Sequence, residues 1–216
     1  MISKRLKTAV LTLLVTCAVG ALAPTAQADP VFEASNSSGT VSGSGNGFEQ
    51  FVTEAGTITC SVGNYTGSYS SKTFSTQRLH PSYSSCSAFG FLSATVNTED
   101  CDFILDPYEK VVTWGYHLRM AIDCPAGDSI KVTASTCSMR IEDTAANQNL
   151  TKIVSLDASG GIILEPEVIW IQYNVTNDGF LCPFFGTGIK NDGRFDPTAV
   201  IPITAAGGAT ITVVGE

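Results

Sequence analysis

The feature that most constrains the fold is an alternating run of apolar and polar residues between positions 109 and 123. Apolar side chains occupy every second position of this run: Val112, Trp114, Tyr116, Leu118, Met120 and Ile122. The residues between them are mostly polar or small. Because successive side chains of a strand point to opposite faces, this pattern predicts a β-strand with one apolar face and one polar face.

The residues that follow this run predict that the chain turns back on itself. Proline and glycine within residues 124–128 supply a fixed φ and a position free to adopt positive φ, as a tight turn requires. Residues 130–137 then alternate again. The sequence therefore predicts one long β-hairpin over residues 109–137, with Trp114 on its buried face and His117 on its solvent face.

Turn residues separate further short apolar segments along the chain. Glycine-containing turns are expected at five places: residues 54–56, 63–64, 67–68, 158–160 and 177–179. Pro107 is expected to end a strand, and no segment has a sustained helical period with capping residues. These features predict an all-β fold, either an antiparallel β-sandwich or two small packed β-units that meet near residues 106–108.

The first 28 residues predict a secretory signal peptide. Lys4, Arg5 and Lys7 precede an apolar stretch that is too short to span a bilayer, and small residues then stand before Ala28. We expect cleavage after Ala28, export and no membrane span. A lipoprotein cleavage box at residues 14–17 is the competing interpretation, but threonine before its cysteine fits that motif poorly.

Residues 29–47 are rich in serine and glycine and low in complexity. Such a composition buries too little apolar area to offset the entropy of ordering, so a flexible segment is predicted before a β-domain at residues 48–216. The alternative is that Val31 and Phe32 begin an early strand.

The charge of the chain argues against nucleic-acid partners. Its formal charge is −8, and removal of residues 1–28 takes away three positive charges and no negative one, which leaves −11. This excess of carboxylates repels phosphate backbones. Extracellular proteins and glycans are the partner classes that the sequence leaves open, and it does not specify an oligomeric state.

Six cysteines follow the signal peptide, and an even number in an exported chain predicts a disulfide framework. We expect three bonds that link strands near in the chain or in one sheet: Cys60–Cys86, Cys101–Cys124 and Cys137–Cys182. A structural zinc site is disfavoured because no two of these cysteines stand two to four residues apart.

Four stretches together resemble a group of exported, Thr/Gly-rich, six-cysteine bacterial proteins. They are the segments at residues 55–60, 81–86, 94–97 and 124–130, and their motifs are turns and cysteines. The likeness covers most of the chain after the signal peptide. It implies a fold and a compartment, and no activity is assigned to that group.

The sequence contains no convincing catalytic motif. There is no GxSxG nucleophile elbow, and the two histidines, His80 and His117, lie in an apparent turn and on a polar strand face. No catalytic residue, metal ligand or cofactor is therefore assigned. The weak candidates are acids in two clusters. Asp100 and Asp102 would suit either glycoside hydrolysis or calcium, and Asp192 and Asp196 would suit calcium. Solvated turn acids are the simpler interpretation of both clusters.

Aromatic residues near the end of the chain supply the last candidates. Flat rings provide contact area at low entropic cost, so a ligand surface is a hypothesis for four residues: Trp170, Tyr173, Phe184 and Phe185. Membership of the core is the simpler alternative. The sequence therefore predicts a secreted, disulfide-stabilised, non-catalytic binding or cell-exterior protein, with a secreted carboxylate-dependent hydrolase as the alternative function.

Overall fold

The computed structural model describes residues 29–54, 56–111, 115–142, 151–156, 160–178, 187–196, 198 and 200–215, with only the backbone at 151–156 and 177–178. The predicted signal peptide and Trp114 lie outside these residues. Within them the chain is all-β, and a 3₁₀ turn at Ala206–Gly208 is the one helical segment. The strands are β1 (Val31–Ala34), β2 (Gly39–Ser44), β3 (Glu49–Thr53), β4 (Gly56–Tyr69), β5 (Thr73–Phe74), β6 (Gln77–Ala88), β7 (Leu92–Asn97), β8 (Asp102–Val111), β9 (Gly115–Asp123), β10 (Ile130–Ala134), β11 (Cys137–Ile141), β12 (Thr151–Leu156), β13 (Ile162–Glu165), β14 (Val168–Asp178), β15 (Gly188–Phe195), β16 (Ile201–Ala205) and β17 (Ile211–Val214).

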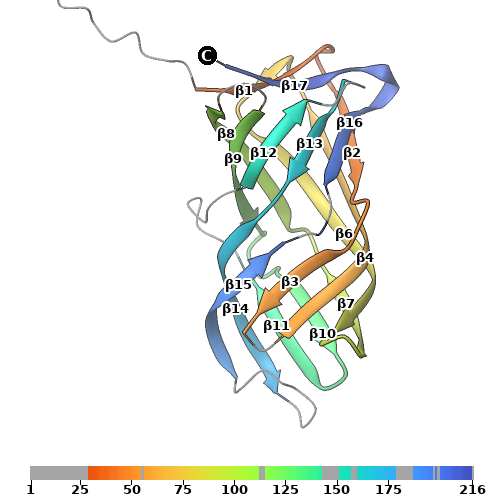
Figure 1. Ribbon diagram of the computed structural model, residues 1–216, viewed down its shortest axis with the longest axis vertical. Helices are drawn as coiled ribbons and strands as arrows, with labels where there is room; N and C mark the ends of the chain where they lie inside the picture. The colour runs from red at the N-terminus through yellow and green to blue at the C-terminus, as the bar shows by residue number, and fades with distance from the viewer. Residues whose placement is uncertain are drawn as a thin grey trace, which may run out of the picture.

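The strand pairings close two antiparallel eight-stranded rings that share β4 and β6 (Figure 1). The upper ring runs β4–β2–β16–β13–β12–β9–β8–β6. The lower ring runs β4–β3–β15–β14–β11–β10–β7–β6. β4 and β6 can serve both rings because they are 14 and 12 residues long. A sandwich is therefore not confirmed, since the hydrogen-bonded strands close on themselves.

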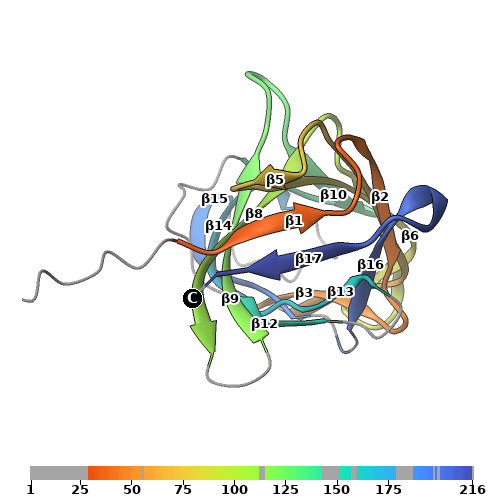
Figure 2. The ribbon, with the colours of Figure 1, turned by 90° about the horizontal axis from the view of Figure 1, so that it is seen from above.

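A separate three-stranded sheet of β5, β1 and β17 lies across the upper end (Figure 2). Phe32 of β1 is fully buried, and its ring stacks on Phe74 at 5.4 Å between centroids. Phe74 stacks in turn on Tyr69 of β4 at 5.5 Å. The serine- and glycine-rich segment is thus not the predicted flexible linker, because β1 and β2 bury Phe32 and Val41 within regular pairings.

The alternation predicted for the run before residue 124 is present in β9. Tyr116, Leu118, Met120 and Ile122 are all buried, whereas Arg119 is exposed and His117 is half-buried. The apolar set faces the interior of the rings, as the period-two pattern requires. Strand type and inward face were therefore predictable from local sequence.

The prediction of one long hairpin over residues 109–137 is wrong. β9 pairs with β8 and β12 in the upper ring, while β10 pairs with β7 and β11 in the lower ring. The turn after Cys124, closed by a hydrogen bond from Asp128 N to Pro125 O at 2.9 Å, carries the chain from one ring to the other. Turn chemistry specifies a change of direction but not the strand that the next segment pairs with.

Three predicted interruptions also need correction. Gly63 and Gly67 do not form turns but lie within β4, and Pro107 lies within β8 beside a register shift. A Cβ on Gly63 would lie 2.6 Å from Glu49 Cγ, and one on Gly67 would meet the Arg78 carbonyl. Glycine in these places permits close packing across the ring rather than a turn. The division proposed near residues 106–108 falls inside β8.

At two other predicted turns the flanking strands pair antiparallel, although residues 55 and 157–159 lie outside the described residues, whereas 177 and 178 of the fifth predicted turn lie within β14. β3 and β4 pair up to Thr53 and Gly56, and β12 and β13 pair up to Leu156 and Ile162. No helix in the part of the chain that the structure describes is long and apolar enough to cross a membrane.

Candidate functional site

The candidate site is built round Glu49, the first residue of β3. Its side chain is only 3% exposed, and it lies opposite Cys60 in the pairing of β3 with β4. Two glycines leave room for it, since a Cβ on Gly45 or Gly63 would collide with the Glu49 side chain. An acid is rarely this buried without a partner.

Two tyrosines of the shared strands face this carboxyl. The ring of Tyr65 on β4 makes an edge-to-face contact with that of Tyr83 on β6 at 6.2 Å. Neither Oε2 of Glu49 nor the Tyr65 hydroxyl completes a hydrogen bond with any residue that the structure describes. Burial raises the pKa of Glu49 to about 7, against the opposing effect of the nearby Tyr65 hydroxyl. Burial likewise raises the pKa of both tyrosines, which stay neutral.

Glu49 lines a cavity of about 50 Å³ in the lower ring. Every strand of that ring contributes to the wall, and β8 and β9 of the upper ring supply Phe103, Met120 and Ile122. Apart from Glu49 and Tyr83, the lining consists of apolar side chains and the disulfide-bonded Cys60. The arrangement is an apolar chamber with one titratable acid in its wall, which suits binding of a small molecule.

The predicted aromatic surface is not assembled as expected. Trp170 is 67% exposed, with a φ of 63° where the pairing of β14 with β15 is irregular. Tyr173, three residues later, is buried and donates a hydrogen bond to Asp192. Phe184 and Phe185 lie outside the described residues. The structure therefore separates Trp170 from Tyr173 and shows no shared aromatic face for them.

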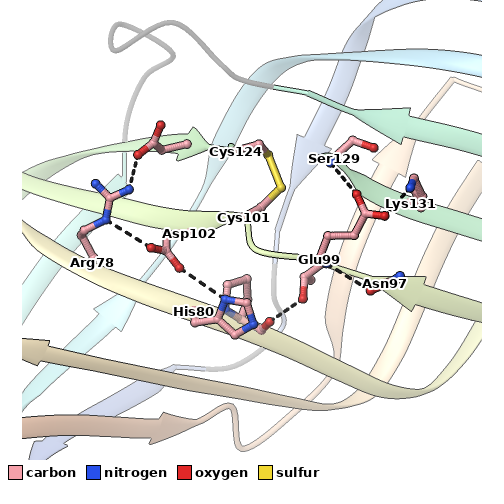
Figure 3. The surroundings of a disulfide bond; sticks show 12 residues. Arg78, His80, Asn97, Glu99, Cys101, Asp102, Cys124, Ser129 and Lys131 are labelled. Atoms are coloured by element: carbon pink, nitrogen blue, oxygen red, sulfur yellow. Dashed lines mark hydrogen bonds and ion pairs between the residues drawn. A yellow bond between two sulfur atoms is a disulfide. The ribbon is translucent and has the colours of Figure 1, made fainter. Parts of the chain in front are cut away.

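Asp102 lies beside the Cys101–Cys124 disulfide, and its carboxylate contacts basic side chains (Figure 3). Arg78 Nε contacts its carboxylate at 3.1 Å, and His80 Nδ1 lies 3.3 Å from it. The same guanidinium contacts Asp123. Asp100 is exposed in the turn before β8. This geometry neutralises Asp102 and does not present it with Asp100 as an acid pair.

Glu99, on the other side of the disulfide, is also held by its surroundings (Figure 3). It contacts the Lys131 ammonium and accepts a hydrogen bond from the Ser129 backbone at 2.9 Å. The lysine is the main cause of its lowered pKa. Glu99 therefore ties the turn before β8 to β10 and is not free for acid chemistry.

The second acidic cluster serves a structural role. Asp192 accepts hydrogen bonds from the Tyr173 hydroxyl at 3.0 Å and from the Glu54 backbone at 2.6 Å. Asp196 pairs with Arg194. No group of three or more metal-ligating side chains occurs among the residues described. Asp192 thus ties β15 to β14 and to the residue after β3, and Asp196 pairs with a residue of β15 itself, so the two acids do not converge on an ion.

Two of the predicted disulfides are present. Cys60–Cys86 joins directly opposed residues of β4 and β6, and Cys101–Cys124 links the residues just before β8 and just after β9. Cys137 is also disulfide-bonded. Its predicted partner, Cys182, lies outside the described residues, so that pairing stays a prediction.

Sequence reasoning missed Glu49. Residues 48–52 were recognisable as a strand, but apolar side chains occur on both of its faces, so the pattern did not show which face is buried. The only local signal was a set of glycines, Gly45 and Gly63, whose significance depends on the pairing of β2, β3 and β4. β3 and β4 are consecutive strands, but the pairing of β2 with β4 is not encoded in local sequence.

Comparisons with known proteins gave no further indication of function. No family model, curated protein or solved structure matches this chain.

Proposed function

We propose that this chain is a secreted, non-catalytic binding protein whose lower ring holds a small, mainly apolar molecule. The observation that carries the proposal is the apolar cavity of about 50 Å³ with Glu49 in its wall. Apolar cavities in proteins take up apolar guests such as xenon and benzene. A cavity of this size suits a molecule of a few non-hydrogen atoms, and a flexible lining residue such as Met120 can adapt to a slightly larger one.

Export is supported by the chemistry of the cysteines. Disulfides persist in oxidising compartments, and Cys60–Cys86 and Cys101–Cys124 are both formed here. The proposed membership of the exported six-cysteine group agrees with this location. N-terminal sequencing of protein recovered outside the cell should begin at Asp29, and an intact residue 1 would contradict export with cleavage.

The alternative function, a carboxylate hydrolase, has no observation in its favour. A glycosidase needs two acids facing a common cleft. Asp102 is instead engaged by Arg78 and His80, and Glu99 by Lys131.

The binding proposal is tested with xenon as an apolar probe. In solution NMR under xenon pressure, methyl signals of the cavity lining, such as those of Ile130 and Val132, should shift first and saturate. Val132→Leu adds a methylene to the wall and should weaken these shifts. Val41→Leu is the matched control, because Val41 is also buried but lies in the upper ring. Absence of xenon shifts at the lining, or an equal effect of both variants, would overturn the proposal.

A further inference from the structure

We infer that the molecule bound in the lower ring carries one hydrogen-bond acceptor on an apolar body, and that the Glu49 carboxyl donates a hydrogen bond to it. This inference rests on the proposed function and specifies the ligand class of the same cavity. A ketone, an aldehyde or an ether has the required chemistry.

The position of Glu49 is the first argument. Oε2 is buried and has no hydrogen-bond partner among the described residues, although the side chain lines the cavity. A buried polar group without a partner is costly, so a complementary group on a guest molecule gains more here than it would in water. The remaining wall offers apolar contact to the rest of the guest.

The packing round the acid is the second argument. Gly45 and Gly63 both leave space that the Glu49 side chain fills, and a Cβ on either would collide with it. Two independent backbone positions therefore accommodate the acid at this point of the wall. An apolar residue of similar size at position 49 would satisfy the packing alone, so the carboxyl has a role that packing does not explain.

The protonation state of Glu49 decides whether its carboxyl donates a hydrogen bond to the guest or accepts one. Burial keeps the Glu49 proton on up to about neutral pH. The titratable groups facing it are Tyr65 from β4 and Tyr83 from β6, which stay neutral, and no cation faces the carboxyl among the described lining residues. A protonated carboxyl has one O–H to donate, so it selects a guest with an acceptor.

The test compares acetone with isobutene, which have the same shape and differ in the carbonyl oxygen. Affinities are measured by NMR titration of the lining methyl groups at pH 5.5 and pH 8.5. In the wild-type protein, the ratio of the affinity for acetone to that for isobutene should fall about tenfold from pH 5.5 to pH 8.5, because the ionised carboxylate no longer donates a hydrogen bond to acetone. Glu49→Gln keeps an N–H donor at both values, so its preference should not change with pH.

Glu49→Leu removes the donor while retaining a similar volume, and it should show the reduced preference at both pH values. Gln77→Leu is the matched control, because Gln77 is a buried polar residue outside the cavity, and its preference should equal that of the wild type. If both probes bind and the preference is the same in wild type and Glu49→Leu, the inference is overturned while cavity binding stands. If neither probe binds at either pH, the proposed function fails as well.

Discussion

The two rings each bury one large polar side chain beside a glycine of β4, and the two side chains differ in their charge and in their hydrogen bonds. In the upper ring, Gln77 is 1% exposed, and its amide nitrogen donates to the carbonyl oxygens of Arg78 at 2.6 Å and Ser68 at 3.4 Å, while its Oε1 has no partner among the described residues. In the lower ring, Glu49 is 3% exposed and its Oε2 has no partner among the described residues. Gly67 makes room for the first side chain and Gly63 for the second.

The difference separates a structural polar residue from a candidate functional one. Gln77 joins β6 to β4 with a neutral amide whose donors are used. Glu49 is an ionisable group that faces an apolar cavity. A fold that keeps a buried acid with no cation beside it gives up stability at that point, and such costs concentrate at functional sites.

The largest expected effect on stability comes from removing a packed side chain from each ring. Ile162 of the upper ring is fully buried, and Ile130 of the lower ring is 4% exposed but lines the cavity. We expect Ile162→Ala to cost about 4 kcal/mol and Ile130→Ala about 2 kcal/mol, because a side chain beside an existing cavity has fewer contacts to lose. Urea melts measure both, and equal costs would show that the two interiors are packed alike.

The next effect is the pH dependence of stability. The folded-state pKa of Glu49 is raised from 4.5 to about 7. Its contribution to stability is therefore complete below pH 4.5 and is lost as pH rises to about 7, because the unfolded carboxyl ionises first. The loss amounts to about 3 kcal/mol.

Glu49→Gln should remove this part of the pH dependence. Denaturant melts between pH 4 and pH 8 would show a flatter curve for the variant than for the wild type. Parallel curves would mean that Glu49 ionises alike in the folded and unfolded states.

A smaller effect should differ in sign between the rings. At pH 8, Gln77→Leu should destabilise the protein by about 1–3 kcal/mol, because two carbonyl oxygens lose a donor. Glu49→Leu should stabilise it by about 1–3 kcal/mol, because an ionised buried acid with no cation beside it is replaced by an apolar side chain. Thermal melts of the two variants decide this, and destabilisation by both would remove the distinction between the two side chains.

Local sequence was enough to predict some of these structural features. The inward face of β9 followed from alternation, and the cysteine count predicted a disulfide framework. The count did not specify the pairing, and the two bonds that are present were predicted on the assumption that strands near in the chain or in one sheet are linked. The two-ring topology could not be predicted from local sequence, because β9 and β10 are adjacent in sequence but pair in different rings. The buried place of Glu49 depends on the same long-range pairings, since β3 reaches β15, far along the chain.

The smallest expected effect lies on the outer surface of β9. Arg119 lies over the Tyr108 ring at 4.8 Å, and His117 Nδ1 lies 3.2 Å from Glu109. Because these groups are partly solvated, His117→Ala and Arg119→Ala should each cost about 0.5 kcal/mol or less in denaturant melts. A cost as large as that of Ile162→Ala would show that the outer face is covered.

The central claim is that Glu49 is a buried acid with no cation beside it among the described lining residues, and its carboxyl titration tests this directly. The ¹³C chemical shift of the Glu49 carboxyl can be followed by NMR from pH 3 to pH 9, with Glu49→Gln to assign the signal. The account predicts a midpoint near pH 7, in line with the burial of the side chain. A midpoint near pH 4.5 would contradict it, because the carboxyl would then be as well solvated or as well paired as an ordinary surface acid.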